Sequence, residues 1–184
     1  DIITIDAIGC QKEILKGIRQ KKADYLIALK KNQGNLFAEV ENFFSQAIAA
    51  PEYAPVSMWQ TESTCHGRQE IQRVWVTQDL EWLEVRKEWH SLGFLVCVQR
   101  SWESQGRVES QTRYYVSSLF RPPQEFAQLV RRHWAIENEY HWHLDVTFRE
   151  DDSEIAARSN KILRVARTIA LQLLKAQPED KLSM

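Results

Sequence analysis

An acid at the end of an apolar run is the first feature of this sequence that could do chemistry. Asp6 lies near the end of the β-branched run Ile2–Ala7 and just before Gly9. Open α/β sheets bind ligands beyond the carboxyl ends of their strands, so an acid at this position is well placed to hold a metal ion. Asp also caps helices and forms turns, and that structural role is the alternative.

A second candidate is a stripe of ionisable residues within the polar and aromatic segment His133–Asp151. If this segment is helical to about residue 145, then His133, Glu137, His141 and Asp145 recur every four residues and share one face. Such groups bind metal ions or move protons. The alternative is a buried network in which the histidines pair with acids. Zinc ligation is a weaker alternative because the spacing is not HExxH.

Basic residues form the third candidate. Lys30 and Lys31 follow an apolar run, and Arg131 and Arg132 precede Glu137. Such cations could contact DNA phosphates, which supplies affinity without reading sequence. The chain as a whole has 24 Lys and Arg against 25 Asp and Glu, a net charge of -1. Any site for a polyanion must therefore be local.

Hydrophobic periodicity predicts the elements that hold the first candidates. Ile2–Ala7 and Asp24–Leu29 are apolar runs of strand length, separated by a helical pattern. This order predicts a βαβ unit, whose strands are parallel neighbours in one sheet. Leu36–Ile48 has one apolar face, which is typical of an amphipathic helix.

After Pro51 and Pro55 the sequence changes to short strand-like runs separated by polar breaks. Residues 56–118 are therefore predicted to form an antiparallel β sub-domain, which contains five of the seven tryptophans. Its expected strands are Gln60–Thr64, Glu70–Gln78, Gly93–Arg100 and Val108–Ser117. Pro122 and Pro123 then open a helix that runs toward Leu144, and a last amphipathic helix is expected at Ile162–Lys175.

Composition sets the broad class. The 184 residues are 43% hydrophobic and 27% charged, which is typical of one soluble globular domain, or of one large domain with a sub-domain. No apolar run reaches the roughly 18 to 20 residues of a membrane span, and no signal peptide is visible, so we expect a cytoplasmic protein without membrane contact. Cys10, Cys65 and Cys97 form no CxxC and are expected to be reduced and structural. The chain begins with Asp1, and we expect it to be a piece of a longer protein.

Five strings of residues, taken in order along nearly the whole chain, resemble the H-repeat-associated family of DDE insertion-sequence transposases. They are TIDAIGCQKEI (Thr4–Ile14), DYLIALKKNQ (Asp24–Gln33), HGRQEIQRVWV (His66–Val76), TRYYVSSL (Thr112–Leu119) and RRHWAIENEYHWHLDVTFRED (Arg131–Asp151).

The resemblance implies an α/β, ribonuclease H-like fold, here partial because its opening strands are missing, with an inserted antiparallel β sub-domain. Residues 1–55 would be the first part of the catalytic core, 56–120 the insertion and 121–184 the C-terminal helices. In this family two Asp and one Glu hold two Mg²⁺ (or Mn²⁺) ions for cutting and joining DNA. The second Asp corresponds to Asp6 and the Glu to Glu137.

The resemblance also implies DNA as the partner, both the insertion-sequence ends and the target, and it allows a homodimer on DNA. The β insertion would face DNA, with Trp75 or Trp102 stacking on an unpaired base. Residues expected to support the metal ligands or to bind phosphate are His133, His141, Asp145, Arg131 and Arg132. The family's first Asp lies on an earlier strand, so this chain alone is expected to be weakly active or inactive.

Two alternatives come from other classes of protein. One is a catalytically inactive transposase remnant with at most DNA binding, favoured by the missing first Asp. The other is a metal-dependent hydrolase that uses His133, Glu137 and His141. Metal identity separates this hydrolase from the transposase, because tight zinc binding favours the former and preference for Mg²⁺ or Mn²⁺ the latter.

Overall fold

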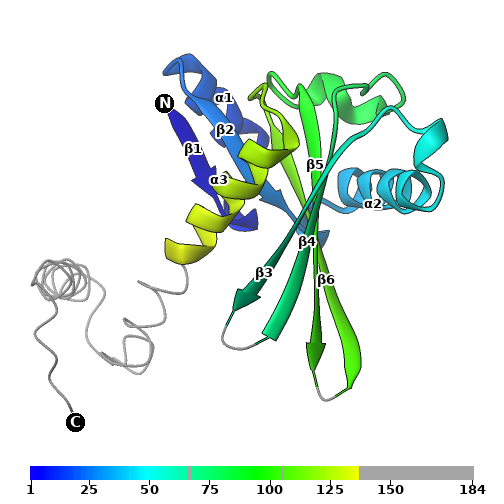
Figure 1. Ribbon diagram of the computed structural model, residues 1–184. Helices are drawn as coiled ribbons and strands as arrows, with labels where there is room; N and C mark the ends of the chain where they lie inside the picture. Colours follow the sequence, from blue (N-terminus) through cyan, green and yellow to red (C-terminus); the bar gives the residue numbers. More distant parts are fainter. Residues whose placement is uncertain (66–67, 105, 137–184) are drawn as a thin grey trace, which may run out of the picture. The chain divides into compact units, whose positions relative to one another are not determined.

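The structure is a computed structural model that describes residues 1–65, 68–104 and 106–136 (Figure 1). The chain divides into two compact units, residues 1–130 and residues 131–184. The first unit is a mixed α/β structure around a six-stranded sheet with the strand order β1-β2-β6-β5-β4-β3.

The predicted βαβ unit opens the chain. Strand β1 (Ile2–Ile5) leads to helix α1 (Lys12–Gln20), and strand β2 (Asp24–Leu29) follows. The two strands are parallel and in register from Ile2 opposite Asp24 to Ile5 opposite Ile27, which confirms the expected pairing. β1 ends two residues before the predicted limit, because Ala7–Gly9 forms a 3₁₀ turn.

Four antiparallel strands follow, as the sequence predicted, and they join the sheet of the βαβ unit, which it did not predict. They are β3 (Ser57–Cys65), β4 (Arg68–Thr77), β5 (Phe94–Ser104) and β6 (Arg107–Ser117). β6 pairs antiparallel with β2, from Leu26 opposite Ser117 to Leu29 opposite Tyr114. The four strands therefore continue the sheet of the βαβ unit, and β1 and β3 are its edges within the described residues.

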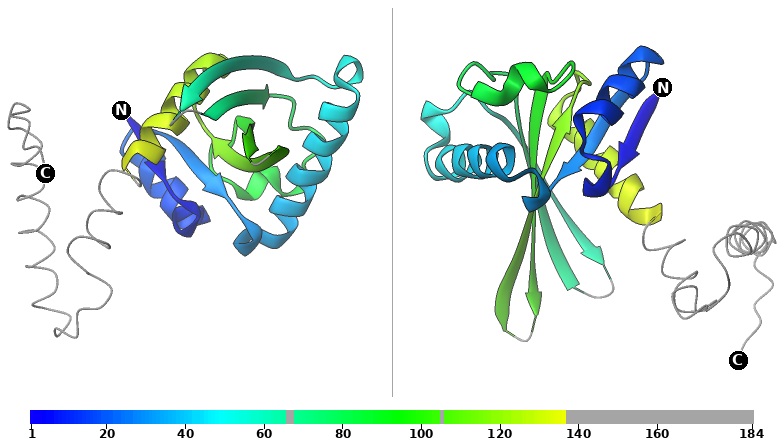
Figure 2. Two further views of the ribbon diagram at one scale, coloured as in Figure 1. Left: turned by 60° about the horizontal axis from the view of Figure 1, so that its bottom comes forward. Right: turned by 180° about the vertical axis from the view of Figure 1, so that it is seen from behind.

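The main core lies on one face of this sheet. Helix α2 (Gly34–Ala49) covers it with Leu36, Val40 and Phe44, and α1 adds Leu15 and Ile18. The first turns of helix α3 (Pro123–Ile136) lie on the opposite face, where Phe126 and Val130 are fully buried (Figure 2). Both faces of the central strands are thus covered, which matches the nearly continuous apolar run of β2.

The far halves of β3–β6 differ from this covered part. Arg107–Thr112 of β6 are exposed, whereas Tyr114–Ser117 are buried. The hairpins β3–β4 and β5–β6 extend well past α1 and α2 (Figure 1). Their polar side chains on both faces explain why these halves need no cover from helices.

The predicted helix after the two prolines is present from Pro123 to Ile136. Its expected continuation toward Leu144 and the predicted helix Ile162–Lys175 lie outside the described residues. Within the described ranges, no helix has both the length and the apolar character needed to cross a membrane.

Candidate functional site

Asp6 lies at the carboxyl end of an edge strand. It directly follows β1, and Lys30 directly follows β2. Because β1 and β2 are parallel neighbours, their carboxyl ends meet at the same end of the sheet. This places Asp6 and Lys30, two residues singled out from the sequence, side by side.

The Asp6 carboxylate contacts a cation instead of capping the turn that follows it. The Lys30 Nζ lies 3.0 Å from Oδ1 and 3.3 Å from Oδ2 of Asp6. Asp6 makes no side-chain capping hydrogen bond to the turn Ala7–Gly9. The Asp6 side chain is 45% exposed and that of Lys30 is 59% exposed. The side-chain cap is therefore absent, whereas the Asp6 carbonyl accepts the Gly9 N–H at 2.9 Å, so the residue does start this turn, as the structural alternative expected.

Two side-chain amides join the loop after β1 to the segment after β2. Asn32 Nδ2 donates to the carbonyl of Ala7 at 2.9 Å, and Gln33 Nε2 donates to the carbonyl of Cys10 at 2.6 Å. The loop that carries Asp6 is thus held by two residues of the segment that follows β2. The sequence marked these residues only as a polar exit from a strand. Asn and Gln side chains can donate hydrogen bonds to backbone carbonyls, and this property of the residue types was the one indication of their role in the sequence.

Cys10 anchors the end of this loop in the hydrophobic core. Its side chain is fully buried in the core, and burial raises the pKa of its thiol to about 12. Cys97 is also free and buried, and burial raises the pKa of its thiol to about 12. Both thiols stay protonated at neutral pH, as expected of structural cysteines.

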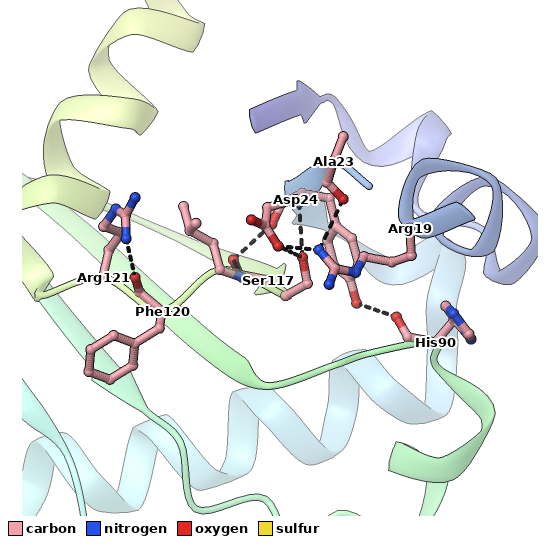
Figure 3. A network of polar contacts seen from close by, with 10 residues as sticks. Arg19, Ala23, Asp24, His90, Ser117, Phe120 and Arg121 are labelled. Carbon is pink, nitrogen blue, oxygen red and sulfur yellow. Dashed lines mark hydrogen bonds and ion pairs between the residues drawn. The ribbon is translucent and has the colours of Figure 1, made fainter. Parts of the chain in front are cut away.

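A second acid of the same strand pair has a structural role. Asp24, at the amino end of β2, forms an ion pair with Arg19 and accepts a hydrogen bond from Ser118 Oγ at 3.0 Å (Figure 3). Arg19 also donates to the carbonyl of Ala23 at 3.0 Å. These contacts tie α1, β2 and the end of β6 together, at the end of β2 opposite to Lys30.

Trp75 is not available to DNA in this structure. It is 5% exposed and belongs to the core under α2. A base could stack on its ring only if the core opened, so this residue is removed from the candidate DNA contacts. The apolar run around Trp75 could not reveal this, because strand residues alternate between faces and the sequence does not say which face is covered.

Trp102 lies on the exposed half of β5 and is partly buried. It is directly opposite Glu70 of β4 on one side and Glu109 of β6 on the other. Residues directly opposite each other share a face of the sheet, so two carboxylates flank this ring. A hollow of about 440 Å³ between the two hairpins is lined by Trp102, Glu70 and Glu103, among others.

The basic candidates of α3 are on the surface of that helix. Arg131 and Arg132 are exposed, and His133 is partly buried. Glu137, His141 and Asp145 lie outside the described residues. In the part of the chain that the structure describes, no group of three or more His, Cys, Asp or Glu side chains is placed to hold a metal ion.

Comparison with known proteins gives the family. Residues 1–173 match the family described as "Transposase DDE domain". The chain is 38% identical to "Putative transposase YncI" of Escherichia coli O157:H7, over 95% of this chain and 46% of that protein. It is 37% identical to "Putative protein YbfL" and 36% identical to "H repeat-associated putative transposase YhhI", both of Escherichia coli K12, over 94% of this chain and 47% of each relative. No solved structure matches.

The chain therefore belongs to the transposase DDE domain family, and the resemblance to H-repeat-associated transposases is confirmed. It spans about half the length of the curated relatives named above.

The carboxylate of Asp6, taken alone, is chemically suited to the divalent metal that this family implies. Both carboxylate oxygens already face one cationic group, the ammonium of Lys30. Carboxylate oxygens are also the ligands that Mg²⁺ and Mn²⁺ prefer.

Proposed function

We propose that this chain is the C-terminal part of a DDE transposase, which cuts and joins DNA at insertion-sequence ends by metal-dependent phosphodiester transfer. The observation that carries the proposal is the position of Asp6, at the carboxyl end of a parallel strand with its carboxylate facing a cation. Membership of the DDE family supports it. The fold proposed for the complete catalytic core is ribonuclease H-like.

Asp6 and Glu137 are the proposed metal ligands of this chain. When bound, two divalent ions in such a site activate the attacking oxygen and stabilise the leaving oxygen of the phosphodiester. Asn32 and Gln33 hold the loop of Asp6 in place. A further carboxylate, from the part of the protein that precedes β1, would complete the ligand set.

DNA is the proposed substrate and partner. The exposed halves of β3–β6 are the proposed DNA-facing surface, and all cations of these four strands are arginines. Arg100 is engaged with Glu70, and the candidates for DNA contact are Arg68, Arg73, Arg107 and Arg113. Arginine binds phosphate in a bidentate manner, which suits contact with a nucleic-acid backbone. Lys30, Lys31, Arg131 and Arg132 are proposed as further phosphate contacts, and a homodimer on DNA as the working assembly.

Calorimetric titration of the 184-residue chain with Mn²⁺ and Mg²⁺ tests this function. We expect binding by the wild type and loss of binding in Asp6→Asn and Glu137→Gln. Glu81→Gln is the matched control, because Glu81 is an exposed acid in the loop after β4 and follows neither of the two parallel strands. Circular dichroism of each variant establishes that it is folded.

Two other outcomes would reject the proposal. A folded chain that binds neither metal would be a transposase remnant. Tight zinc binding that is lost in His133→Ala and His141→Ala would indicate a hydrolase instead, since imidazole suits zinc better than Mg²⁺.

A further inference from the structure

Lys30 forms an ion pair with the proposed metal ligand, and the two residues follow different strands. Its Nζ lies within 3.3 Å of both carboxylate oxygens of Asp6. An ammonium that contacts both oxygens lies where a divalent ion would bind the same carboxylate. A divalent ion that binds both oxygens needs this position, and two cations on one carboxylate repel each other, so such an ion displaces the ammonium.

The backbone around Lys30 is fixed, whereas its side chain is free to turn. Gln33 N–H donates to the Lys30 carbonyl at 3.0 Å, and Gln33 and Asn32 grip the Asp6 loop through their amides. The Lys30 side chain itself is 59% exposed and carries its charge on a flexible four-carbon stem. Movement of the ammonium away from Asp6 therefore requires no change in the fold.

The ion pair is weak enough to exchange. Both partners are about half exposed, and exposed pairs of this kind contribute about 0–1 kcal/mol. A doubly charged ion with several oxygen ligands displaces such an ammonium readily. Once displaced, the ammonium still lies beside the site, where the nearest new anion during reaction is a phosphate of the DNA substrate.

We propose that Lys30 is an exchangeable counter-cation of Asp6. Without a metal ion, its ammonium neutralises the carboxylate. With a metal ion bound, the same ammonium contacts a DNA phosphate next to the site. This proposal rests on the proposed function, and it makes Lys30 a DNA contact that acts only when the metal site is filled.

The first test is Mn²⁺ titration of the 184-residue chain and its variants. Lys30→Met removes the competing charge and is expected to bind Mn²⁺ about two- to five-fold more tightly than the wild type. Lys30→Arg retains the charge and is expected to remain near wild type. Lys21→Met is the matched control, because it removes the same charge from an exposed lysine at the C-terminal end of α1, at the opposite end of the strands.

The second test is the salt dependence of binding to a DNA duplex, measured with and without Mn²⁺. With Mn²⁺, the slope of log K against log salt is expected to be smaller by about 1 for Lys30→Met than for the wild type. Without Mn²⁺, the two slopes are expected to agree, because Asp6 holds the ammonium. In Asp6→Asn, the contact with phosphate is expected without any metal.

The outcomes separate this proposal from the proposed function. If the wild type binds Mn²⁺ through Asp6 but Lys30→Met binds it equally well, Lys30 is not an exchangeable counter-cation of Asp6. The proposed function stands in that case. A Lys30→Met effect on the salt slope that is independent of Mn²⁺ also overturns the exchange. If no variant binds Mn²⁺, both proposals fail.

Discussion

A Cβ atom on Gly9 would lie 2.5 Å from Cγ2 of Ile5, closer than real Cβ contacts come. Gly9 closes the 3₁₀ turn that follows Asp6, and its N–H donates to the Asp6 carbonyl at 2.9 Å. Ile5 is the last residue of β1. The close approach between the turn and the strand therefore fixes where the Asp6 loop begins.

Gly9→Ala is expected to destabilise the chain. The added methyl must push the loop or the strand, and overpacking of this kind costs about 1–3 kcal/mol of unfolding free energy. Gly17→Ala is the control, because nothing lies within 4 Å of a Cβ at this helical position. There the same change should stabilise by roughly 0.5–1 kcal/mol. Urea unfolding measures both, and an equal effect at the two glycines would contradict the close approach.

Asn32→Ala is expected to weaken Mn²⁺ binding. The Asn32 amide donates to the Ala7 carbonyl at 2.9 Å and holds the loop that carries Asp6. Loss of one such hydrogen bond, about 1 kcal/mol, corresponds to roughly five-fold lower affinity. Asn35→Ala, an exposed Asn at the start of α2, is the matched control in the same calorimetric titration. Unchanged affinity in Asn32→Ala would show that the loop holds its shape without this amide.

Stability is expected to fall as the pH rises above about 9. The buried Cys10 thiol has a pKa of about 12 in the folded chain, above its ordinary value of 9.0. Between these values the folded state keeps a proton that the unfolded state loses, so unfolding is favoured by up to about 1.4 kcal/mol per pH unit.

Urea unfolding between pH 8.5 and about 9.5, where most tyrosines are still protonated, measures this loss of stability. The fall should be shallower in Cys10→Ala, and identical slopes for this variant and the wild type would contradict the assignment. Below about pH 9, no effect of this thiol is expected.

Glu70→Gln is expected to destabilise the projecting hairpins. Glu70 accepts two hydrogen bonds from Arg100, at 2.8 Å from Nε and 2.5 Å from Nη2, and its side chain is 12% exposed. Hydrogen bonds to charged groups contribute about 1.5–3 kcal/mol.

The control is Glu88→Gln, which breaks the ion pair of Glu88 with Lys12, whose side chains are 57% and 49% exposed. A change of at most about 1 kcal/mol is expected there. Urea unfolding compares the two variants, and equal losses would mean that burial of the Glu70 pair has no energetic consequence.

Many helices and strands were predictable because the local pattern of apolar and polar residues indicates them. The boundaries predicted for Asp24–Leu29 are those of β2, since an apolar run bounded by polar residues is how a doubly covered strand appears in sequence. The pairing of β2 with β6 was not predicted. Leu26 and Ser117 are neighbours through long-range topology, and periodicity contains no information about which strands pair.

The site was predictable in part for the same reason. Asp6 and Lys30 were each marked by their place after a strand, but their contact depends on the parallel pairing of β1 and β2. The amide contacts of Asn32 and Gln33 were missed because they reach carbonyls of a different loop. Side-chain type indicates that an amide can bind a carbonyl, and only the folded chain shows which carbonyl it binds.

Trp102 offers the sharpest test of the DNA-facing role proposed for the hairpins. If a base stacks on this ring, Trp102→Ala should lower affinity for single-stranded DNA by the roughly 1–3 kcal/mol that such stacking contributes. Glu109 lies directly opposite Trp102, and its carboxylate repels the phosphates of a bound strand. Glu109→Gln should therefore raise affinity about two- to five-fold at low salt, with the gain lost at high salt.

Fluorescence anisotropy of a labelled oligonucleotide measures both changes. Met58→Ala is the matched control, because Met58 is 56% exposed on β3, lies outside the hollow at Trp102 and carries no ring or charge. Opposite signs for Trp102→Ala and Glu109→Gln would support a nucleic-acid surface at this position. If neither variant changes affinity while the chain still binds DNA, the contact surface lies elsewhere, and the exposed Arg107 of β6 becomes the next residue to replace.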